Sequence, residues 1–279
     1  MPEGHTIHRV ARDHTKLFAG HRLEVSSPQG RFSDGAAWLS GRRLDRVEAM
    51  GKHLFYHWAA SKRGPKKSGA AGAGDILHIH LGLYGKFQLH HRKAAEPWPE
   101  PRGAVRLRIA GKAAAFDLNG PNQCELLDAA GYQRATQRLG PDPLRDDADP
   151  DLAWRRIERS KTPIGALLMN QEVIAGVGNI YRCETLHLLG IHPNRPGKDV
   201  SGDEFDALWD KLVELMEIGV KYDRIITTSP SEVGKPPSKM TRDERLRIYK
   251  KPTCADCGGA IDAWTMAGRK VFACPHCQS

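Results

Sequence analysis

The first residues of the chain have the types needed for amine chemistry. Removal of Met1 leaves Pro2 as a free secondary amine, and the carboxylate of Glu3 follows directly. An α-amine has a reference pKa of about 8, so a usable fraction is uncharged at neutral pH and can attack an electrophilic carbon to form an iminium. The plainer interpretation is that Pro2 only permits removal of Met1 and that Glu3 begins a helix. These residues alone do not decide between the two.

Four of the six cysteines lie close together near the end of the chain, in two C-x2-C motifs: Cys254-Ala-Asp-Cys257 and Cys274-Pro-His-Cys277. Two such motifs at this spacing can place four thiolates around one Zn²⁺, and the segment between them is typical of a β-hairpin. Because four cysteines complete the site, this zinc is predicted to be structural. Two disulfides are the alternative, which a reducing compartment disfavours. His276 is available to replace one cysteine ligand.

Two further stretches are suited to phosphate. One helix is predicted to end near Asn170 and the next to begin at about Asn179, with a tight turn through Gly176 and Gly178. Small residues let a backbone approach a phosphate, and a helix N-terminus offers N–H groups to it. An ordinary corner between two helices is the alternative. In the cysteine hairpin, Arg269 lies at the predicted tip, where it either meets a phosphate backbone or is solvated.

Composition sets the broad class of the protein. The 279 residues suffice for about two domains, and hydrophobic residues make up 40% of the chain and charged residues 27%. A net charge of +9 makes DNA or RNA the first candidate partner. No apolar run approaches the ~20 residues of a membrane span, and the N-terminus lacks a signal-peptide core. We therefore expect a protein of a bacterial-type cytoplasm or of a nucleus, with no membrane partner.

Sequence periodicity predicts a change of structure part-way along the chain. Residues 3–19 have helical spacing, and from 21 to 128 short strands alternate with turns, which is typical of a β-sandwich or barrel. Residues 61–74 are predicted to form a basic loop. A boundary rich in Pro and Asp at 137–151 precedes predicted helices at 151–159, 164–170, 178–189 and 203–220. We expect an N-terminal domain over 2–136, a helical domain over 137–250 and a zinc finger over 251–279.

Several of these motifs together resemble the formamidopyrimidine-DNA glycosylase / endonuclease VIII family. They occur in the family's order: the Met-Pro-Glu-Gly start, the lysine in Gly51-Lys52-His53, Ala-Gly-Val-Gly-Asn-Ile-Tyr at 175–181, and the four-cysteine finger with Gly268-Arg269. The resemblance covers essentially the whole chain. It implies an α+β multidomain fold, with an N-terminal helix on a β-sandwich, then a helix–two-turn–helix domain that carries the zinc-finger hairpin.

The resemblance also implies a function and the residues that perform it. Pro2 would attack C1′ of a damaged nucleotide and displace the base, with strand cleavage by β- and δ-elimination to follow. Glu3 matches the family's acid/base residue and Lys52 its essential lysine. Asn179 and Arg269 match residues that bind phosphate. Lys161, in Ser-Lys-Thr-Pro, is expected to add another phosphate contact.

A base taken out of the duplex leaves a gap that an enzyme must fill. Leu83 and Tyr84 stand where the family places its wedge, and this pair is more similar to the endonuclease VIII branch. The other branch adds an Arg-Arg-Phe loop, which is missing from the corresponding residues 121–125. The resemblance therefore favours oxidised pyrimidines over 8-oxoguanine. Gly82 replaces a polar residue found beside the wedge in some relatives.

The chain departs from the family at residues five and six, where His5-Thr6 replaces the usual Pro-Glu. Because threonine does no proton chemistry at neutral pH, an abasic-site lyase with weak base excision is one alternative function. A zinc-finger protein that binds DNA without catalysis is another, but it does not explain Pro2, Glu3 and Lys52 together. We expect a monomer that acts on damaged, double-stranded DNA in the bacterial nucleoid.

Overall fold

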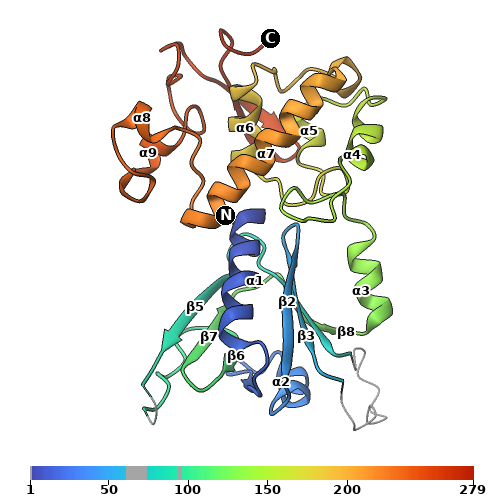
Figure 1. Ribbon diagram of the computed structural model, residues 1–279, viewed down its shortest axis with the longest axis vertical. Helices are drawn as coiled ribbons and strands as arrows, with labels where there is room; N and C mark the ends of the chain where they lie inside the picture. The colour runs from blue at the N-terminus through green and yellow to red at the C-terminus, as the bar shows by residue number, and fades with distance from the viewer. Residues whose placement is uncertain (1, 61–73, 94–95) are drawn as a thin grey trace. The chain divides into compact units, whose positions relative to one another are not determined.

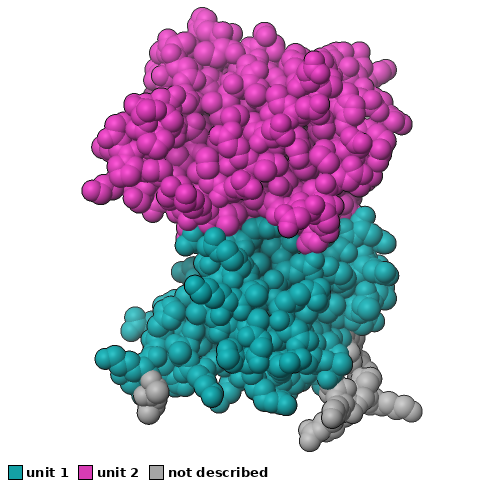
Figure 2. Space-filling view, viewed as in Figure 1, with its two compact units in different colours: residues 1–2, 7–137 teal, residues 3–6, 138–279 magenta. Residues whose placement is uncertain are grey.

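The computed structural model describes residues 2–60, 74–93 and 96–279. These residues form two compact units, which Figure 2 colours separately. Unit 1 comprises Pro2 and residues 7–137, and unit 2 comprises residues 3–6 and 138–279. The predicted loop at 61–74 lies outside the described residues apart from Gly74. The division into three domains stays a prediction.

Unit 1 contains two antiparallel four-stranded sheets (Figure 1). The first has the order β1 (Glu24–Ser26), β6 (Val105–Ala110), β7 (Ala114–Asn119) and β5 (Lys86–His91). The second has the order β2 (Leu44–Met50), β3 (His53–Trp58), β4 (Ile76–His80) and β8 (Gln123–Leu127). Alternate residues of these strands are apolar, so each sheet has one face that can be buried.

One hydrophobic core joins the two sheets to the N-terminal helix. Tyr56 from β3, Phe116 from β7 and Phe18 from α1 (Gly4–Phe18) are all fully buried in it. A core shared by both sheets makes unit 1 a β-sandwich, and the fold predicted for this part of the chain is confirmed. The short strands predicted between residues 21 and 128 form as β1 to β8. The predicted helix at 3–19 is confirmed by α1.

Two helices of unit 1 were not predicted: α2 (Ser33–Leu39) and α3 (Ala129–Thr136). The first begins without a side-chain cap, although it buries Ala36 and Leu39. The second is capped by Asp128, whose carboxylate accepts from the N–H of Gly131 at 2.7 Å. Tertiary burial therefore stabilises α2, while α3 has a local signal in Asp128 that the strand pattern obscured.

Unit 2 is helical and ends in the cysteine hairpin (Figure 1). Its α-helices are α4 (Pro150–Ile157), α5 (Ile164–Leu167), α6 (Asn179–Leu188), α7 (Gly202–Tyr222), α8 (Pro230–Val233) and α9 (Arg242–Arg245). Short 3-10 helices span Gly197–Asp199 and Pro237–Lys239. The hairpin pairs β9 (Asp262–Met266) with β10 (Arg269–Ala273), as predicted.

Helix α6 lies at the centre of unit 2, because residues on every face of it are buried. Helix α7 packs against it through an apolar face that includes Leu212 and Met216. Ser201 and Glu204 form a capping box at the start of α7, which fixes where this helix begins. No described helix combines the length and the apolar character that a bilayer crossing requires.

Candidate active site and DNA-contacting residues

The carboxylate of Glu3 is held at the N-terminus of α6. Its Oε1 accepts from the N–H of Ile180 at 2.9 Å, its Oε2 lies 3.5 Å from the N of Tyr181, and its side chain is fully buried. The first N–H groups of a helix have no partner within the helix and carry partial positive charge. The residue after Pro2 is therefore fixed by a helix that lies far along the sequence.

The glycines of the turn before α6 make room for Glu3. A Cβ at Gly178 would overlap the Glu3 carboxylate, 2.6 Å from its Oε1. Gly176 has a positive φ of 89°, and its carbonyl oxygen accepts from the N–H of Gly4 at 2.8 Å. A Cβ at Gly4 would lie 2.9 Å from the Cα of Gly176. In the structure, N–H groups at the start of α6 meet the Glu3 carboxylate. The contact of this turn with phosphate stays a prediction.

His5 and Thr6, the residues that depart from the family pattern, follow Glu3 into unit 2. His5 is 5% exposed and packs edge-on against Tyr181, with ring centroids 5.4 Å apart. Burial lowers the pKa of His5 to about 4, so its ring is neutral at pH 7. Its Nε2 lies 3.2 Å from the Thr6 hydroxyl. His5 thus packs as a neutral core residue.

Pro2 and Lys52 both belong to unit 1. Pro2 is half-buried and directly precedes α1. Lys52 is half-buried in the turn between β2 and β3, after Gly51, which has a φ of 58°. The catalytic roles of both residues stay predictions.

A network of histidines begins next to Lys52. His53 Nδ1 lies 2.9 Å from His78 Nε2, and His78 Nδ1 lies 3.0 Å from a carboxylate oxygen of Glu125. Burial lowers the pKa of His53 to about 3, and the positive charge of Lys52 contributes to this shift. Burial also lowers the pKa of His78, so both rings are neutral at pH 7.

Leu83 and Tyr84 lie in the turn between β4 and β5, beside Gly82. Leu83 is 47% exposed and Tyr84 is 85% exposed, which is unusual for side chains of this size. The predicted wedge residues therefore form a protruding apolar pair on unit 1.

The four predicted metal-ligating cysteines come together in the hairpin, and their sulfur atoms all lie within 4.8 Å of one another. Cys254 and Cys277 have Sγ atoms 4.0 Å apart, and Cys257 and Cys274 have Sγ atoms 3.4 Å apart. Tetrahedral zinc with Zn–S bonds of about 2.3 Å requires sulfurs about 3.8 Å apart. The four thiols therefore fit such an ion. All six cysteines lie in the described part of the chain, and each is a free thiol.

A second set of side chains touches the cysteine cluster from outside it. His187, at the end of α6, has its Nε2 at 3.7 Å from Cys254 Sγ and at 2.6 Å from a carboxylate oxygen of Asp256. Arg247 binds the other oxygen of Asp256 at 2.5 Å. His276, considered as a replacement ligand, is absent from the cysteine group.

Asn179 links the hairpin to α6. Its side-chain amide donates to the carbonyl oxygen of Lys270 at 2.9 Å, and its carbonyl oxygen accepts from Arg182. The fully buried Arg182 also donates to the carbonyl oxygens of Gly165 at 3.3 Å and Met266 at 3.2 Å. The Asn179 side chain is thus engaged within unit 2, and its contact with phosphate stays a prediction.

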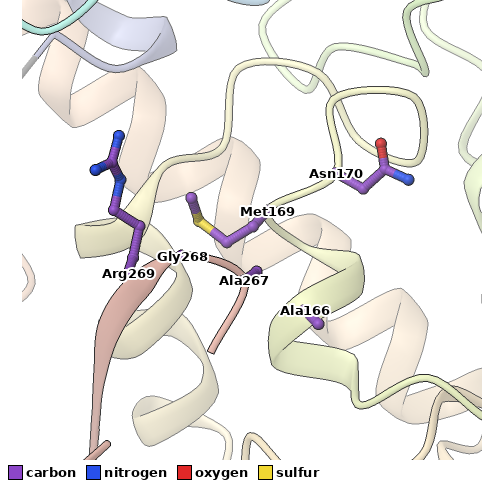
Figure 3. Close-up of a pocket in the computed structure, with 6 residues that line it drawn as sticks. All are labelled: Ala166, Met169, Asn170, Ala267, Gly268 and Arg269. Atoms are coloured by element: carbon purple, nitrogen blue, oxygen red, sulfur yellow. The ribbon is translucent and has the colours of Figure 1, made fainter. Parts of the chain in front are cut away.

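Arg269 is exposed at the start of β10 and lines an open pocket of about 430 Å³. The pocket lies between the hairpin turn, with Ala267 and Gly268, and the segment after α5, with Met169 and Asn170 (Figure 3). Lys161 is exposed in the turn that precedes α5. Exposed donors of this kind suit an anion, and their contact with DNA is taken up below.

Comparison with known proteins decides the family. The sequence profile of the formamidopyrimidine-DNA glycosylase N-terminal domain matches residues 1–121, and that of the family's H2TH domain matches residues 139–231. Endonuclease 8 1 of Mycobacterium tuberculosis strain H37Rv is 47% identical over 281 residues, which cover 100% of both chains. The chain belongs to the formamidopyrimidine-DNA glycosylase family.

More distant relatives agree with this assignment. The formamidopyrimidine-DNA glycosylase of Thermomicrobium roseum is 31% identical over 79% of this chain and 81% of its own. A solved structure of MutM in complex with carbocyclic 8-oxo-G containing DNA has a TM-score of 0.74, with 23% identity and full coverage of both chains. The Lactococcus lactis enzyme in complex with a FAPY-dG containing DNA has a TM-score of 0.73, with 22% identity over 98% of each chain. The two structures show that the fold is shared.

Membership of this family makes the protein a DNA glycosylase with abasic-site lyase activity. Its sequence motifs identified the family, but several contacts in the site carried no motif. Arg182 is a charged residue in the middle of a helix, and only its full burial shows that it joins α5, α6 and the hairpin. His187 has no metal-ligand spacing to the cysteines. The signal available for Arg182 was an arginine among apolar neighbours in a predicted helix. His187 had no such signal in the sequence.

Proposed function

We propose that this protein excises oxidised bases from damaged, double-stranded DNA and cleaves the resulting abasic site through a Schiff base on Pro2. The observation that carries the proposal is the buried carboxylate of Glu3 at the start of α6. Adjacent Cα atoms are 3.8 Å apart, so anchoring Glu3 confines the amine of Pro2 to a small volume. Chain ends usually fray, and a helix start needs no such anchor.

The reaction begins at the amine of Pro2. The nitrogen lone pair attacks C1′ of the damaged nucleotide, the N-glycosyl bond breaks, and the base leaves with the bonding electrons and takes up a proton. Opening of the sugar then gives an iminium between Pro2 and C1′. Loss of a C2′ proton expels the 3′ phosphate by β-elimination, and δ-elimination then releases the 5′ phosphate. Glu3 is the group that protonates the sugar and carries protons during elimination.

The positively charged side chains are assigned to the DNA phosphates and to the Pro2 amine. The ammonium of Lys52 favours the uncharged form of Pro2 and holds a phosphate or donates a proton near C1′. Arg269 can grip a phosphate with two parallel N–H groups, and Lys161 adds a point charge. Asn179 contributes its amide after a rearrangement of its bond to Lys270. One monomer in the bacterial nucleoid is sufficient for this chemistry.

The hairpin thiols are assigned to one structural Zn²⁺, held by Cys254, Cys257, Cys274 and Cys277. The sulfur separations of 3.4 and 4.0 Å support this assignment. Four thiolates leave no open position for water or substrate, so the metal holds the hairpin that carries Arg269. The catalytic steps belong to the protein's own residues.

Oxidised pyrimidines are the proposed substrates. The name of the 47% identical relative, Endonuclease 8 1, is in line with the Leu83–Tyr84 pair and with the short turn at residues 120–122. Leu83 and Tyr84 fill the gap left by the extruded base. Thr6 in place of the family's glutamate favours a lyase that is stronger than the glycosylase. Rates on thymine glycol, 5-hydroxyuracil, 8-oxoguanine and a plain abasic site test both statements.

The decisive experiment is borohydride trapping of a covalent protein–DNA adduct. A chain with residues added before Pro2 should give no adduct, because its proline nitrogen is an amide, and proteolytic removal of the extension should restore trapping. The Pro2→Ala variant should trap at least about 100-fold less, since a correctly held nucleophile lowers the barrier by several kcal/mol. Equal trapping by the extended chain would place the nucleophile elsewhere.

Glu3→Gln separates chemistry from anchoring. The amide oxygen of glutamine still accepts from the N–H of Ile180, but the group no longer transfers protons at neutral pH. We expect this variant to keep its thermal stability and to lose about 100-fold or more in cleavage rate. Loss of folding together with activity would instead assign Glu3 to structure alone.

A further inference from the structure

The turn that presents Leu83 and Tyr84 rests on the turn between β7 and β8. The backbone N–H of Asn122 donates to the carbonyl oxygen of His80 at 2.8 Å, just before the exposed pair. A Cβ at Gly120 would lie 3.5 Å from the carbonyl oxygen of Tyr84. All of these residues belong to unit 1, so their arrangement is fixed within one compact body.

Asn122 occupies the space that a side chain at position 82 would need. A Cβ at Gly82 would lie 2.9 Å from Cβ and 3.5 Å from Cγ of Asn122. Gly82 also has a φ of 65°, which disfavours other residues there. The polar group beside Leu83 and Tyr84 is therefore supplied by the neighbouring turn.

The Asn122 carboxamide is available to a ligand. The residue is exposed, and within the described part of the chain its side chain has no hydrogen-bond partner. It lies against Gly82, which directly precedes two apolar residues that are 47% and 85% exposed. A free donor and acceptor next to a protruding apolar pair is the combination that a base requires, with one group to stack and one to hydrogen-bond to its edge.

We propose that Asn122 hydrogen-bonds to the base left unpaired opposite the lesion, while Leu83 and Tyr84 fill the gap beside it. The inference rests on the proposed function. Every base has a neighbouring donor and acceptor on its Watson–Crick edge, and a carboxamide has one of each, so Asn122 can pair with all four. The chain is thereby tolerant of the opposite base.

Substitutions at Asn122 should change this tolerance in opposite directions. Arginine offers donors only and fits the two adjacent acceptors of cytosine, whereas aspartate offers acceptors only and fits the two adjacent donors of guanine. Asn122→Arg should therefore favour a lesion opposite cytosine, and Asn122→Asp a lesion opposite guanine, each by about tenfold over the other bases. Asn122→Ala should lose about tenfold in activity against all four.

The test measures kcat/KM on 5-hydroxyuracil opposite each of the four bases and in single-stranded DNA. For each variant, the kcat/KM values opposite the four bases are compared as ratios, because a change in folding or in overall affinity affects all four values equally. The single strand has no opposite base, so Asn122→Ala should match the unchanged protein there. Gln88→Ala removes an exposed carboxamide from β5 and is the matched control, with no change expected on any substrate.

Two results would overturn the inference: opposite-base ratios unchanged in both the Arg and Asp variants, or an equal loss on single-stranded and duplex DNA in Asn122→Ala. Borohydride trapping of the unchanged protein on the duplex substrate is run alongside. Absence of that adduct contradicts the proposed function itself, whereas trapping with unchanged ratios contradicts only the role of Asn122.

Discussion

The β-sandwich and the cysteine hairpin are both antiparallel, but they are stabilised in different ways. The sandwich draws its core from two four-stranded sheets and α1, with Phe18, Tyr56 and Phe116 fully buried. The hairpin has two strands, and the cluster it joins is small, with Val271 and Ile248 buried beside the thiols of Cys254 and Cys274. Two strands alone are marginally stable in water. Apolar burial can therefore stabilise the sandwich by itself, whereas we expect the hairpin to depend on the zinc proposed for its four thiols.

Removal of the metal is the strongest way to separate the two regions. Structural zinc contributes about 10–16 kcal/mol of apparent binding free energy, and this energy folds the segment that binds it. A chelator should therefore remove the protection of residues 251–279 from hydrogen exchange and leave that of β2 and β3 unchanged. DNA affinity should fall with it, because Arg269 loses its position.

The cysteine variants supply the control for this prediction. Cys274→Ser should mimic the chelator, while Cys124→Ser, which changes a half-buried thiol of the sandwich, should retain the hairpin and one zinc per chain. Protection of the hairpin that survives both chelation and Cys274→Ser would mean that its strands are stable without metal.

Acid should weaken the sandwich through a buried histidine. His14 lies in the sandwich core, with its Nδ1 2.7 Å from the Tyr56 hydroxyl and its ring stacked on Phe116. Burial lowers the pKa of His14 to about 3, from 6.5 in the unfolded chain. Between these values the unfolded state binds the extra proton, so the free energy of unfolding falls as the pH drops from 6.5 towards 3. The slope is about 1.4 kcal/mol per pH unit for one proton.

Urea unfolding between pH 7 and pH 4 measures this slope. His14→Gln removes the titrating ring and should flatten the dependence by about one proton, and His21→Gln, at an exposed position, should retain it. An unchanged slope in His14→Gln would show that other groups, such as His53, carry the acid sensitivity.

The contrast between the two regions also explains what could be predicted. The strands of the sandwich follow from alternation of apolar residues, which is a local property, and the cysteine cluster follows from its spacing. The helix α2 was missed because its stability comes from the burial of Ala36 and Leu39. Elements with a periodic or spaced signal were thus accessible from sequence, and elements that depend on tertiary burial were not.

The candidate site likewise has features that the sequence predicts and features that only the structure shows. Pro2, Glu3 and Lys52 were found because they belong to motifs, but the place of the Glu3 carboxylate on α6 joins residues 177 positions apart. The same holds for Arg182, whose partners lie on α5 and in the hairpin. Sequence identified which groups were candidates, while the structure showed which of their hydrogen bonds are already used within the protein.

The smallest predicted effect concerns the side chain that supports one thiolate of the hairpin. His187 lies 3.7 Å from Cys254 Sγ and is buried, and its contact with Asp256 fixes the orientation of the ring. Groups that orient metal ligands typically change metal affinity by 10- to 100-fold, about 1.4–2.7 kcal/mol. His187→Ala should therefore bind zinc about 10- to 100-fold more weakly, as measured by competition with a chromogenic chelator.

His192 provides the matched control, because it also touches the hairpin but not the thiols. Its ring stacks on Trp264 of β9, with centroids 5.6 Å apart. His192→Ala removes packing of similar size, so it should lower thermal stability while zinc affinity stays within about threefold of the unchanged protein. Equal zinc affinities in the two variants would show that His187 only packs against the cluster. A selective loss in His187→Ala would show that α6 supports the hairpin through its metal ligand, a dependence for which the sandwich has no counterpart among its described residues.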